Sequence, residues 1–309
     1  MPNTVYSNSF LANEAEDQFN SHLNLERFCQ VNNTLTGIAG MKYVIHRYRA
    51  TNGTQKVTQG NGNTQSITVG FDPIEYDILC AQNRFEWFDE EAMKDPYAIP
   101  VGVRHMATDM FNTVQGDIYG EFKKAELVTV PSAFNFDAFV DAASMFNIEG
   151  LEDTSIFAFV APVDVAAIRK ALLTTLQYTM PVGLAGYVGT VAGINIFTKK
   201  DATPGTITVA TKQAVTIFNK KGMEIERPGR DSSDANIRKN TMFSRKYYVV
   251  ALTDARYAVV MKKGGTMTLS SDTSVNSSKT YYEASGLGYV QAHPATGDDP
   301  SAKGWYELS

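Results

Sequence analysis

Four acidic side chains beside an aromatic cluster are the residues best placed for acid–base chemistry. Glu86, Asp89, Glu90 and Glu91 stand close together in the sequence, next to Trp87. Two carboxylates on either side of a glycosidic bond could hydrolyse it, which makes a soluble hydrolase one hypothesis. Acids gathered at one junction more often form a solvated face or ion pairs, and we expect their partners to be Lys or Arg side chains of a neighbouring chain.

Metal and cofactor chemistry have no matching pattern. The glycines of residues 183–189 are in the wrong register for a dinucleotide-binding loop, and no Gly-Lys-Ser/Thr sequence offers a phosphate loop. The cysteines and histidines are too scattered for a metal-ligand spacing; they are Cys29, Cys80, His22, His46, His105 and His293. We therefore expect no metal, no cofactor and no enzymatic activity, with both cysteines as free thiols.

Length and charge bound the class of protein. The 309 residues can bury a large core in one or two lobes, and 43% hydrophobic with 20% charged residues is typical of a globular protein. The 28 basic and 33 acidic residues are mixed along the chain, which argues against a dedicated nucleic-acid reader and leaves weak nonspecific contact open. Without a secretory signal or an apolar run of about 18 residues, the chain is expected to be soluble and to stay inside the cell.

The elements that position these residues begin with a long hairpin. Its arms are the strand-like runs 42–49 and 66–71, which enclose a polar, glycine-rich tip from Thr51 to Gln65. The tip residues expected to contact another subunit are Thr51, Asn52, Gly53, Lys56, Gly60 and Gly62. Because an isolated two-stranded ribbon is marginally stable in water, the hairpin needs a neighbour. This requirement favours an assembly protein over a catalyst.

A long amphipathic helix follows the acidic junction. Pro96 or Pro100 can occupy its first turn, and apolar residues recur every three or four positions up to Phe122. Its expected buried face includes Val103, Met106, Met110, Val114 and Ile118. About 25 residues at ~1.5 Å each would reach roughly 40 Å, the length of a strut. Lys123 and Lys124 at its end suit the negative pole of the helix dipole.

Shorter elements flank and follow this helix. A strand is predicted at 74–80, and an N-terminal arm is predicted to hold a short helix capped by Asn13. Beyond the long helix, we expect a helix over 136–143 that ends near Gly150, and a central strand over the wholly apolar run 156–161.

The second half of the chain is predicted to be rich in strands. Asp164 can cap a helix over 165–177, and a tight glycine turn marks a hairpin at 186–197. Residues 206–218 read as strand, and the runs 246–252 and 257–261 read as a second hairpin. The charged, proline-interrupted segment 227–240 is expected to be an exposed connection.

Residues after Gly264 are rich in Ser, Thr and Gly. A flexible tail and a small appended β element are both open, with strands conceivable at 287–292 and 305–308. The β element is favoured because five aromatic side chains need burial: Tyr281, Tyr282, Tyr289, Trp305 and Tyr306.

The order of these elements resembles the major capsid proteins of tailed bacteriophages, which share the Hong Kong ninety-seven phage capsid fold. The most specific motifs are Phe157–Pro162 before a helix and the hairpin Gly189–Thr198, which is similar to the family's axial-lobe hairpin. Residues 245–261 resemble the strands that return the chain to the peripheral lobe, and the resemblance covers about residues 10–262.

This resemblance implies an α+β fold of the Hong Kong ninety-seven type, with arm, extended loop, spine helix, and peripheral and axial lobes. The implied division is 1–35 for the N-terminal arm, 36–80 for the extended hairpin loop, 81–154 for the spine helix and peripheral domain, 155–222 for the axial domain, 223–263 for the return strands, and 264–309 for a C-terminal extension.

The resemblance also implies a function. Copies of the chain would form pentamers and hexamers of an icosahedral virion shell around double-stranded DNA, assembled in the host cytoplasm. Lys123 and Lys124 could neutralise phosphates without reading bases. A portal is an expected partner, and so is a separate scaffolding protein, because the chain starts only about 35 residues before the hairpin.

Two related possibilities remain open. An encapsulin-like compartment would use the same fold to enclose a cargo protein, although the polar extension after Gly264 favours the phage shell. Some relatives join a lysine of the extended loop to an asparagine of a neighbouring subunit. Lys56 would be the candidate for such a crosslink.

Overall fold

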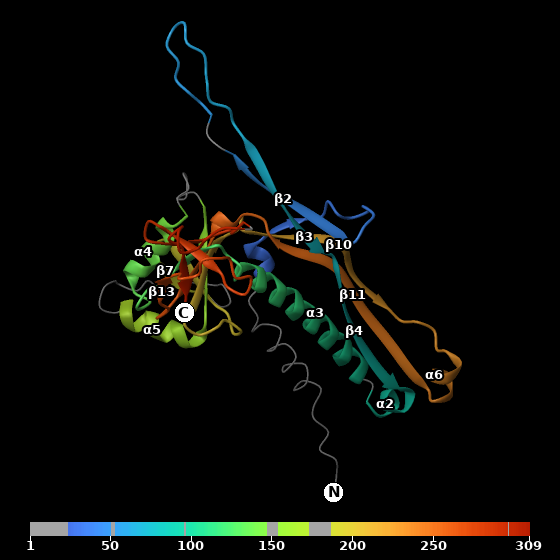
Figure 1. Cartoon of the computed structure of the whole chain (residues 1–309). Coiled ribbons are helices and arrows are strands. Elements are labelled where there is room, and N and C mark those ends of the chain that lie inside the picture. Colours follow the sequence, from blue (N-terminus) through green and yellow to red (C-terminus); the bar gives the residue numbers. More distant parts are fainter. Residues whose placement is uncertain (1–23, 51–52, 96, 147–153, 173–186, 296) are drawn as a thin grey trace.

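The computed structural model describes residues 24–50, 53–95, 97–146, 154–172, 187–295 and 297–309. In these ranges the strands form three sheets: a two-stranded hairpin, a four-stranded sheet, and a ten-stranded sheet in a lobe. Figure 1 shows the hairpin projecting away from the body and helix α3 running beside the four-stranded sheet. None of the helices in the described ranges has both the length and the apolar composition of a membrane span.

Strands β2 (Lys42–Ala50) and β3 (Val69–Asp77) form the hairpin and pair antiparallel along their full length. The first arm lies where the sequence predicts it. The second arm differs, because residues 66–68 carry no strand and residues 74–77 continue β3 instead of starting a separate strand. The reason is a small core at the hairpin root, where Tyr76 packs together with Tyr43 and Ile45 of β2.

The long helix is confirmed as α3 (Ala98–Phe122), with Pro100 in its first turn. Among the residues of its expected buried face, Val103 is half-buried and the others are fully buried: Met106, Met110, Val114 and Ile118. A Cβ atom at Gly102 would lie 2.3 Å from the ring of Phe85, so glycine lets the helix approach the sheet closely.

Helix α3 packs on the four-stranded sheet, which we call the spine sheet. Its strand order is β1 (Gln30–Asn32), β10 (Val215–Glu226), β11 (Lys239–Leu252) and β4 (Leu79–Phe88). A short helix, α2 (Asp89–Lys94), follows β4, and α6 (Ser232–Asn236) lies in the exposed connection between β10 and β11. Figure 1 places α2 and α6 together at the end of the spine sheet away from the lobe.

The lobe is built on the ten-stranded sheet, in the order β13-β16-β14-β15-β5-β12-β9-β6-β8-β7. Its bounds before the C-terminal strands are β5 (Leu127–Thr129), β6 (Ile156–Val160), β7 (Tyr187–Val191), β8 (Ile194–Thr198), β9 (Thr206–Thr211) and β12 (Ala258–Lys262). Every residue of β6 is buried, as expected for a central strand. The predicted β7–β8 hairpin is confirmed, and Ala192 and Gly193 form its turn at φ of 51° and 80°.

The two helices of the lobe differ from their predicted bounds. Helix α4 (Phe136–Ser144) ends at Ser144 and not near Gly150. Helix α5 (Pro162–Leu172) begins before Asp164, so Asp164 is not its N-cap. The Asp164 carboxylate instead accepts a hydrogen bond from the Gly205 N–H at 2.7 Å, which ties the helix to a neighbouring loop. Residues 173–177 of the predicted helix lie outside the described residues.

The predicted hairpin of residues 246–252 with 257–261 is wrong. Strand β11 pairs with β10 and β4, whereas β12 pairs with β5 and β9 in the other sheet. The 3-10 turn η3 (Ala255–Tyr257), capped by Asp254, carries the chain from one sheet to the other. Residues 212–214 make the same crossing alongside, and the Thr253 N–H donates to the Ala214 carbonyl at 2.9 Å.

One hydrophobic core spans the lobe and the spine sheet. It joins Phe157 and Phe159 of β6 to Ile217 of β10, Val250 of β11 and Phe122 of α3. The 3-10 turn η1 (Leu25–Phe28) adds Leu25 and Phe28, and the Phe28 ring lies between 4.6 and 5.4 Å from three lobe phenylalanine rings. The two sheets are therefore packed together as one body.

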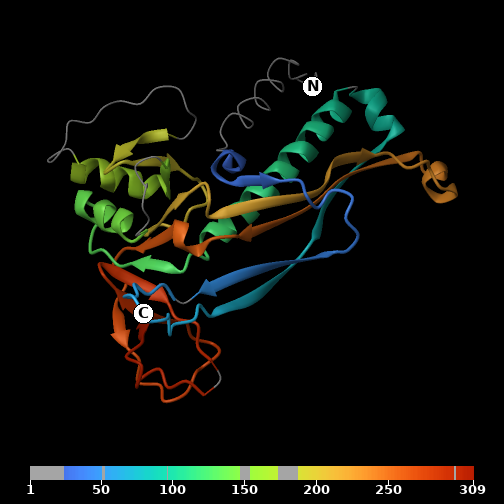
Figure 2. The ribbon, with the colours of Figure 1, turned by 90° about the horizontal axis from the view of Figure 1, so that it is seen from above.

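The C-terminal residues form a small β element, as the aromatic content favoured. Its strands are β13 (Met267–Leu269), β14 (Tyr281–Ser285), β15 (Gly288–Gln291) and β16 (Tyr306–Leu308), and β15 joins them to β5 of the lobe. Tyr281 and Trp305 are buried in its own core, where the Trp305 indole donates to Glu283 at 2.9 Å. Figure 2 shows this red element projecting from the lobe.

Some predictions lie outside the described residues: most of the N-terminal arm, Thr51, Asn52 and Pro96. The division into domains stays a prediction. Strand β5 and helix α4 precede residue 155, and β12 follows residue 222, yet β5 and β12 share the lobe's sheet with β6 to β9.

Candidate assembly surfaces

The acidic junction lies where the end of β4 meets β11 and the connection before it. Glu86 pairs with Lys239 at 2.7 Å and with Arg84 at 3.3 Å. Asp89 pairs with Arg230 and accepts a hydrogen bond from the Asn240 amide at 2.8 Å.

The other two acids of this junction also have partners nearby. Glu90 pairs with Arg238 at 2.5 Å, and the Glu91 carboxylate accepts from the Phe88 N–H at 3.1 Å, which closes the first turn of α2. These partners come from the same chain, whereas the sequence suggested a neighbour.

The electrostatics of this junction suit structure more than acid catalysis. The hydrogen bond from Lys239 lowers the pKa of Glu86, and the hydrogen bond from Arg230 lowers the pKa of Asp89. A general acid of a glycosidase needs a carboxyl whose pKa is raised, so that it still holds a proton near neutral pH. Glu86 and Asp89 are instead held ionised, as clamps between β4 and β11.

The hairpin tip is extended and exposed. No strand is assigned between Gly53 and Thr68, and side-chain contacts such as that from the Asn63 amide to the Gly53 carbonyl at 2.9 Å hold its two sides together. Gly60 takes a φ of 91° in the turn at the end of the tip. Lys56 and Gly62 are exposed, whereas Gly53 is buried against Ile67.

The hairpin also carries exposed apolar side chains. Ile67, Val69 and Phe71 are 61%, 56% and 59% exposed. Scattered exposed apolar residues are ordinary, but three alternate residues on one strand and its extension form a row on one side of a ribbon. Nothing in the described part of the chain covers this row.

The hairpin is anchored to the body only at its root. Leu35, Ile78 and Phe218 form a small core there with residues of β2 and β3. The Lys220 ammonium donates to the carbonyls of Ile38 and Gly40, at 2.5 and 2.7 Å. The rest of the ribbon projects from this anchor (Figure 1).

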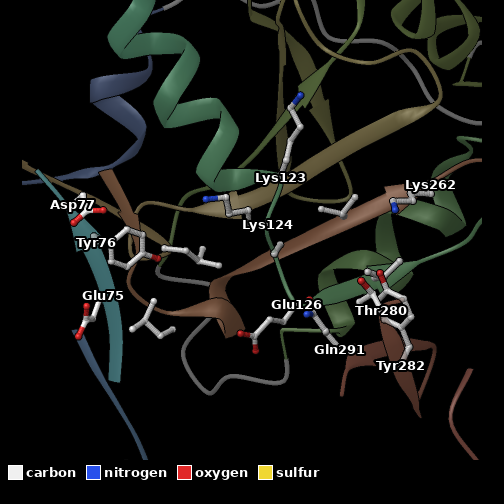
Figure 3. Close-up of a pocket in the computed structure, with 15 residues that line it drawn as sticks. Glu75, Tyr76, Asp77, Lys123, Lys124, Glu126, Lys262, Thr280, Tyr282 and Gln291 are labelled. Carbon is white, nitrogen blue, oxygen red and sulfur yellow. The ribbon is translucent and has the colours of Figure 1, made fainter. Parts of the chain in front are cut away.

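An open cleft of about 610 Å³ separates the hairpin root from the lobe. Figure 3 shows Tyr76 and Asp77 of β3 on one side, and Tyr282 of the C-terminal element and Lys262 of β12 on the other. Lys124, at the end of α3, extends toward the β3 side. Charges of both signs line this cleft, which suits polar contact with another chain.

Metal-ligand clusters are not found among the described residues, where no group of three His, Cys, Asp or Glu side chains could hold an ion. Cys29 is buried, and burial raises the pKa of its thiol to about 12. Cys80 is exposed on β4.

Comparisons with known proteins agree with this architecture. No family model matches the chain. The chain is 24% identical over 269 residues to the major capsid protein of Staphylococcus phage phiMR11, covering 82% of this chain and 92% of that protein.

Solved structures share the fold at low sequence identity. The capsid of cyanophage P-SCSP1u matches with a TM-score of 0.58 and 14% identity, over 77% of this chain and 86% of that one. The mature capsid of bacteriophage PhiM1 gives 0.55 and 12%, over 78% and 86%. The SrpI encapsulin complex from Synechococcus elongatus PCC 7942 gives 0.58 and 12%, over 77% and 86%.

The projecting hairpin, the long helix along its sheet and the mixed lobe thus recur together in phage capsids and in an encapsulin, as the order of elements in the sequence suggested. This chain has the Hong Kong ninety-seven-type capsid fold, and along most of its length it is similar to a phage major capsid protein.

Proposed function

We propose that this chain is the major capsid protein of a tailed bacteriophage, a structural subunit without enzymatic activity. Copies assemble as pentamers and hexamers into an icosahedral virion shell around double-stranded DNA in the host cytoplasm. The similarity to a phage major capsid protein supports this proposal over the encapsulin alternative, because the curated relative is a virion protein.

The observation that carries the proposal is the incomplete hairpin. Two strands of nine residues each project from the body with an exposed apolar row and no covering element in the described residues. A ribbon of this kind gains its stability from contact with another chain. Many such contacts around closed symmetry add up to a stable particle, even where each one is modest.

Deleting Thr51–Gln65 tests the role of the hairpin. Residues 66–68 would remain as a short loop between Ala50 and Val69, which are already paired, so the body should fold. We expect a normal thermal melt but no closed particles by light scattering and negative-stain microscopy. Closed particles of normal size from this variant would contradict the proposal.

The contents of the particle distinguish a phage shell from an encapsulin. Nuclease-protected double-stranded DNA is the outcome expected for a phage shell, and a protein cargo is the outcome expected for an encapsulin. In the proposed shell, Lys123 and Lys124 contact phosphates on the inner face without reading sequence. Lys123 is exposed beside the Tyr119 ring, and Lys124 is held by Glu121 at 2.5 Å, so Lys123 has the freer ammonium of the two.

Three further parts of the proposal concern partners and crosslinks. A portal and a separate scaffolding protein are proposed as assembly partners. The exposed Lys56 is the candidate for a covalent bond between subunits. Boiled, denatured particles that run as a single 34.0 kDa band would exclude this bond.

A further inference from the structure

A second groove lies where the C-terminal half of α3 passes the hairpin root. It has a volume of about 300 Å³ and runs between Leu79 of β4, the α3 residues from Gly116 to Lys124, and Tyr248 of β11. It shares Tyr76, Asp77 and Lys124 with the larger cleft of Figure 3, so the two hollows meet beside the hairpin root.

Two glycines one helical turn apart leave the floor of this groove open. A Cβ atom built at Gly116 or Gly120 meets no atom of the chain within 4 Å. Relative to alanine, a glycine inside a helix weakens its folding equilibrium by about two- to fivefold. Close packing within the chain explains Gly102, but it does not explain these two glycines, because the space above them is empty.

An unsatisfied carboxylate oxygen points independently to a ligand. Glu121 lines the groove and is only 9% exposed. Its Oε1 accepts from Lys124 at 2.5 Å, but its buried Oε2 has no hydrogen-bond partner in the described part of the structure. A buried carboxylate oxygen is costly to leave unsatisfied. A donor brought into the groove would satisfy it after a small rotation of the carboxylate.

The groove has an acidic character. Asp77 and Asp117 line it together with Glu121, against one lysine, Lys124, that is already engaged. Asp117 accepts a hydrogen bond from the Tyr248 hydroxyl at 2.5 Å, which fixes its carboxylate on the wall. The complementary occupant is therefore a basic side chain on a narrow, polar segment.

We propose that the hairpin tip of a second copy of this chain occupies the groove, with the Lys56 ammonium against Glu121 and Asp117. This inference rests on the proposed function. Lys56 is the only charged residue between Thr51 and Thr68, it is exposed, and it has no ion pair within the described residues. The tip's other residues are small or uncharged polar ones with few exceptions, which suits a groove floored by glycine.

The position of the groove gives this contact a direction. Each strand of the hairpin spans about 30 Å at ~3.3 Å per residue, and the tip and the groove lie at opposite ends of that ribbon. Contact of one copy's tip with the next copy's root is head-to-tail. Head-to-tail contacts related by a closing rotation generate rings, such as a pentamer or a hexamer.

The first test fills the groove without harming the chain. Gly120→Leu places a side chain in the open space, and leucine favours the helix more than glycine does. We expect an unassembled chain at least as stable as wild type, with a particle yield at least tenfold lower. Gly120→Ala is the matched control, with a smaller loss of particles. Wild-type particle yield from Gly120→Leu would overturn the inference.

The second test asks whether Lys56 and Glu121 act on each other. Lys56→Met and Glu121→Gln should each reduce particle yield several-fold, and the double variant should be no worse than the poorer single one. Lys56→Met combined with Asp109→Asn, an acid on α3 outside the groove, should show multiplied effects. Multiplied effects for Lys56 with Glu121 would overturn the proposed contact.

The wild-type protein separates failure of this inference from failure of the proposed function. If wild type forms no particles under any assembly condition, the proposed function fails. If wild type forms particles and the groove variants form them equally well, only the tip-to-groove contact fails.

Discussion

The lobe and the hairpin are built from similar strand-forming residues but have opposite surroundings. Strand β6 of the lobe is buried along its whole length between two other strands. Strand β3 of the hairpin has one partner strand, and its Val69 and Phe71 are more than half exposed. The difference teaches that β-branched and aromatic residues mark a strand, while the number of covering neighbours decides whether its stability is internal to the chain.

The comparison breaks first in the lobe, where we expect the largest effect. The Phe159 side chain is fully buried, and its ring lies 5.2 Å from Phe157 and 5.5 Å from Phe122. Phe159→Ala should lower the free energy of unfolding by about 3–5 kcal/mol, measured by urea denaturation of the unassembled chain. A loss below about 1 kcal/mol would show that this core can collapse around the gap.

Glycines at two places on α3 give the next effect. At Gly102, alanine's better helix propensity, worth about 0.5–1 kcal/mol, opposes a clash with the Phe85 ring that costs roughly 1–3 kcal/mol. Because a 2.3 Å contact forces the ring to move, Gly102→Ala should be net destabilising by thermal melt. Gly116→Ala meets no atom within 4 Å and should stabilise the unassembled chain. Two changes of the same sign would refute this account.

Acid should loosen the junction at the far end of the spine sheet before the lobe. Since the folded-state pKa values of Glu86 and Asp89 are lowered, their contribution is present above the ordinary carboxyl pKa of about 4 and is lost as pH falls through the lowered values. Hydrogen exchange at residues 231–240, compared at pH 6 and pH 3 after correction for intrinsic rates, should show extra opening only at pH 3. Glu86→Gln is the control, and its opening should depend less on pH.

The smallest effect on stability is expected in the hairpin, where it should nevertheless matter most for assembly. Phe71→Ser should change the unfolding free energy of the unassembled chain by less than about 0.5 kcal/mol, because its side chain is 59% exposed. Particle yield by light scattering should fall several-fold. Leu269→Ser, 63% exposed in the C-terminal element, is the matched control. Equal particle yields from both variants would remove the distinction between the hairpin and the rest of the surface.

The sequence predicts local elements well where a single period dominates. The long helix follows from apolar residues at steps of three and four, and β6 follows from an unbroken apolar run. The partner of a strand depends on distant residues and is not local. Residues 246–252 and 257–261 look like a hairpin because they are adjacent and alternating, yet the turn at 255–257 sends β12 to a different sheet.

The candidate surfaces show the same limit. Glycine and polar residues identify the exposed tip, because such a composition cannot build a core. The ion-pair partners of Glu86 and Asp89 lie far along the chain, so no spacing rule could name Lys239 or Arg230. Gly116 and Gly120 read in the sequence only as weak points of a helix. Their open space beside an unsatisfied Glu121 oxygen is visible only once the helix, β4 and β11 are assembled.

The core shared by the lobe and the spine sheet has a mechanical consequence. Phe157, Ile217 and Val250 lie in one packed interior that straddles the two crossings of the chain, so a force on either end is transmitted as through a rigid lever. The ribbon is fastened by a much smaller core. Where subunits must adapt to different local curvature, the bending therefore concentrates at the ribbon's base, and the body turns as one piece.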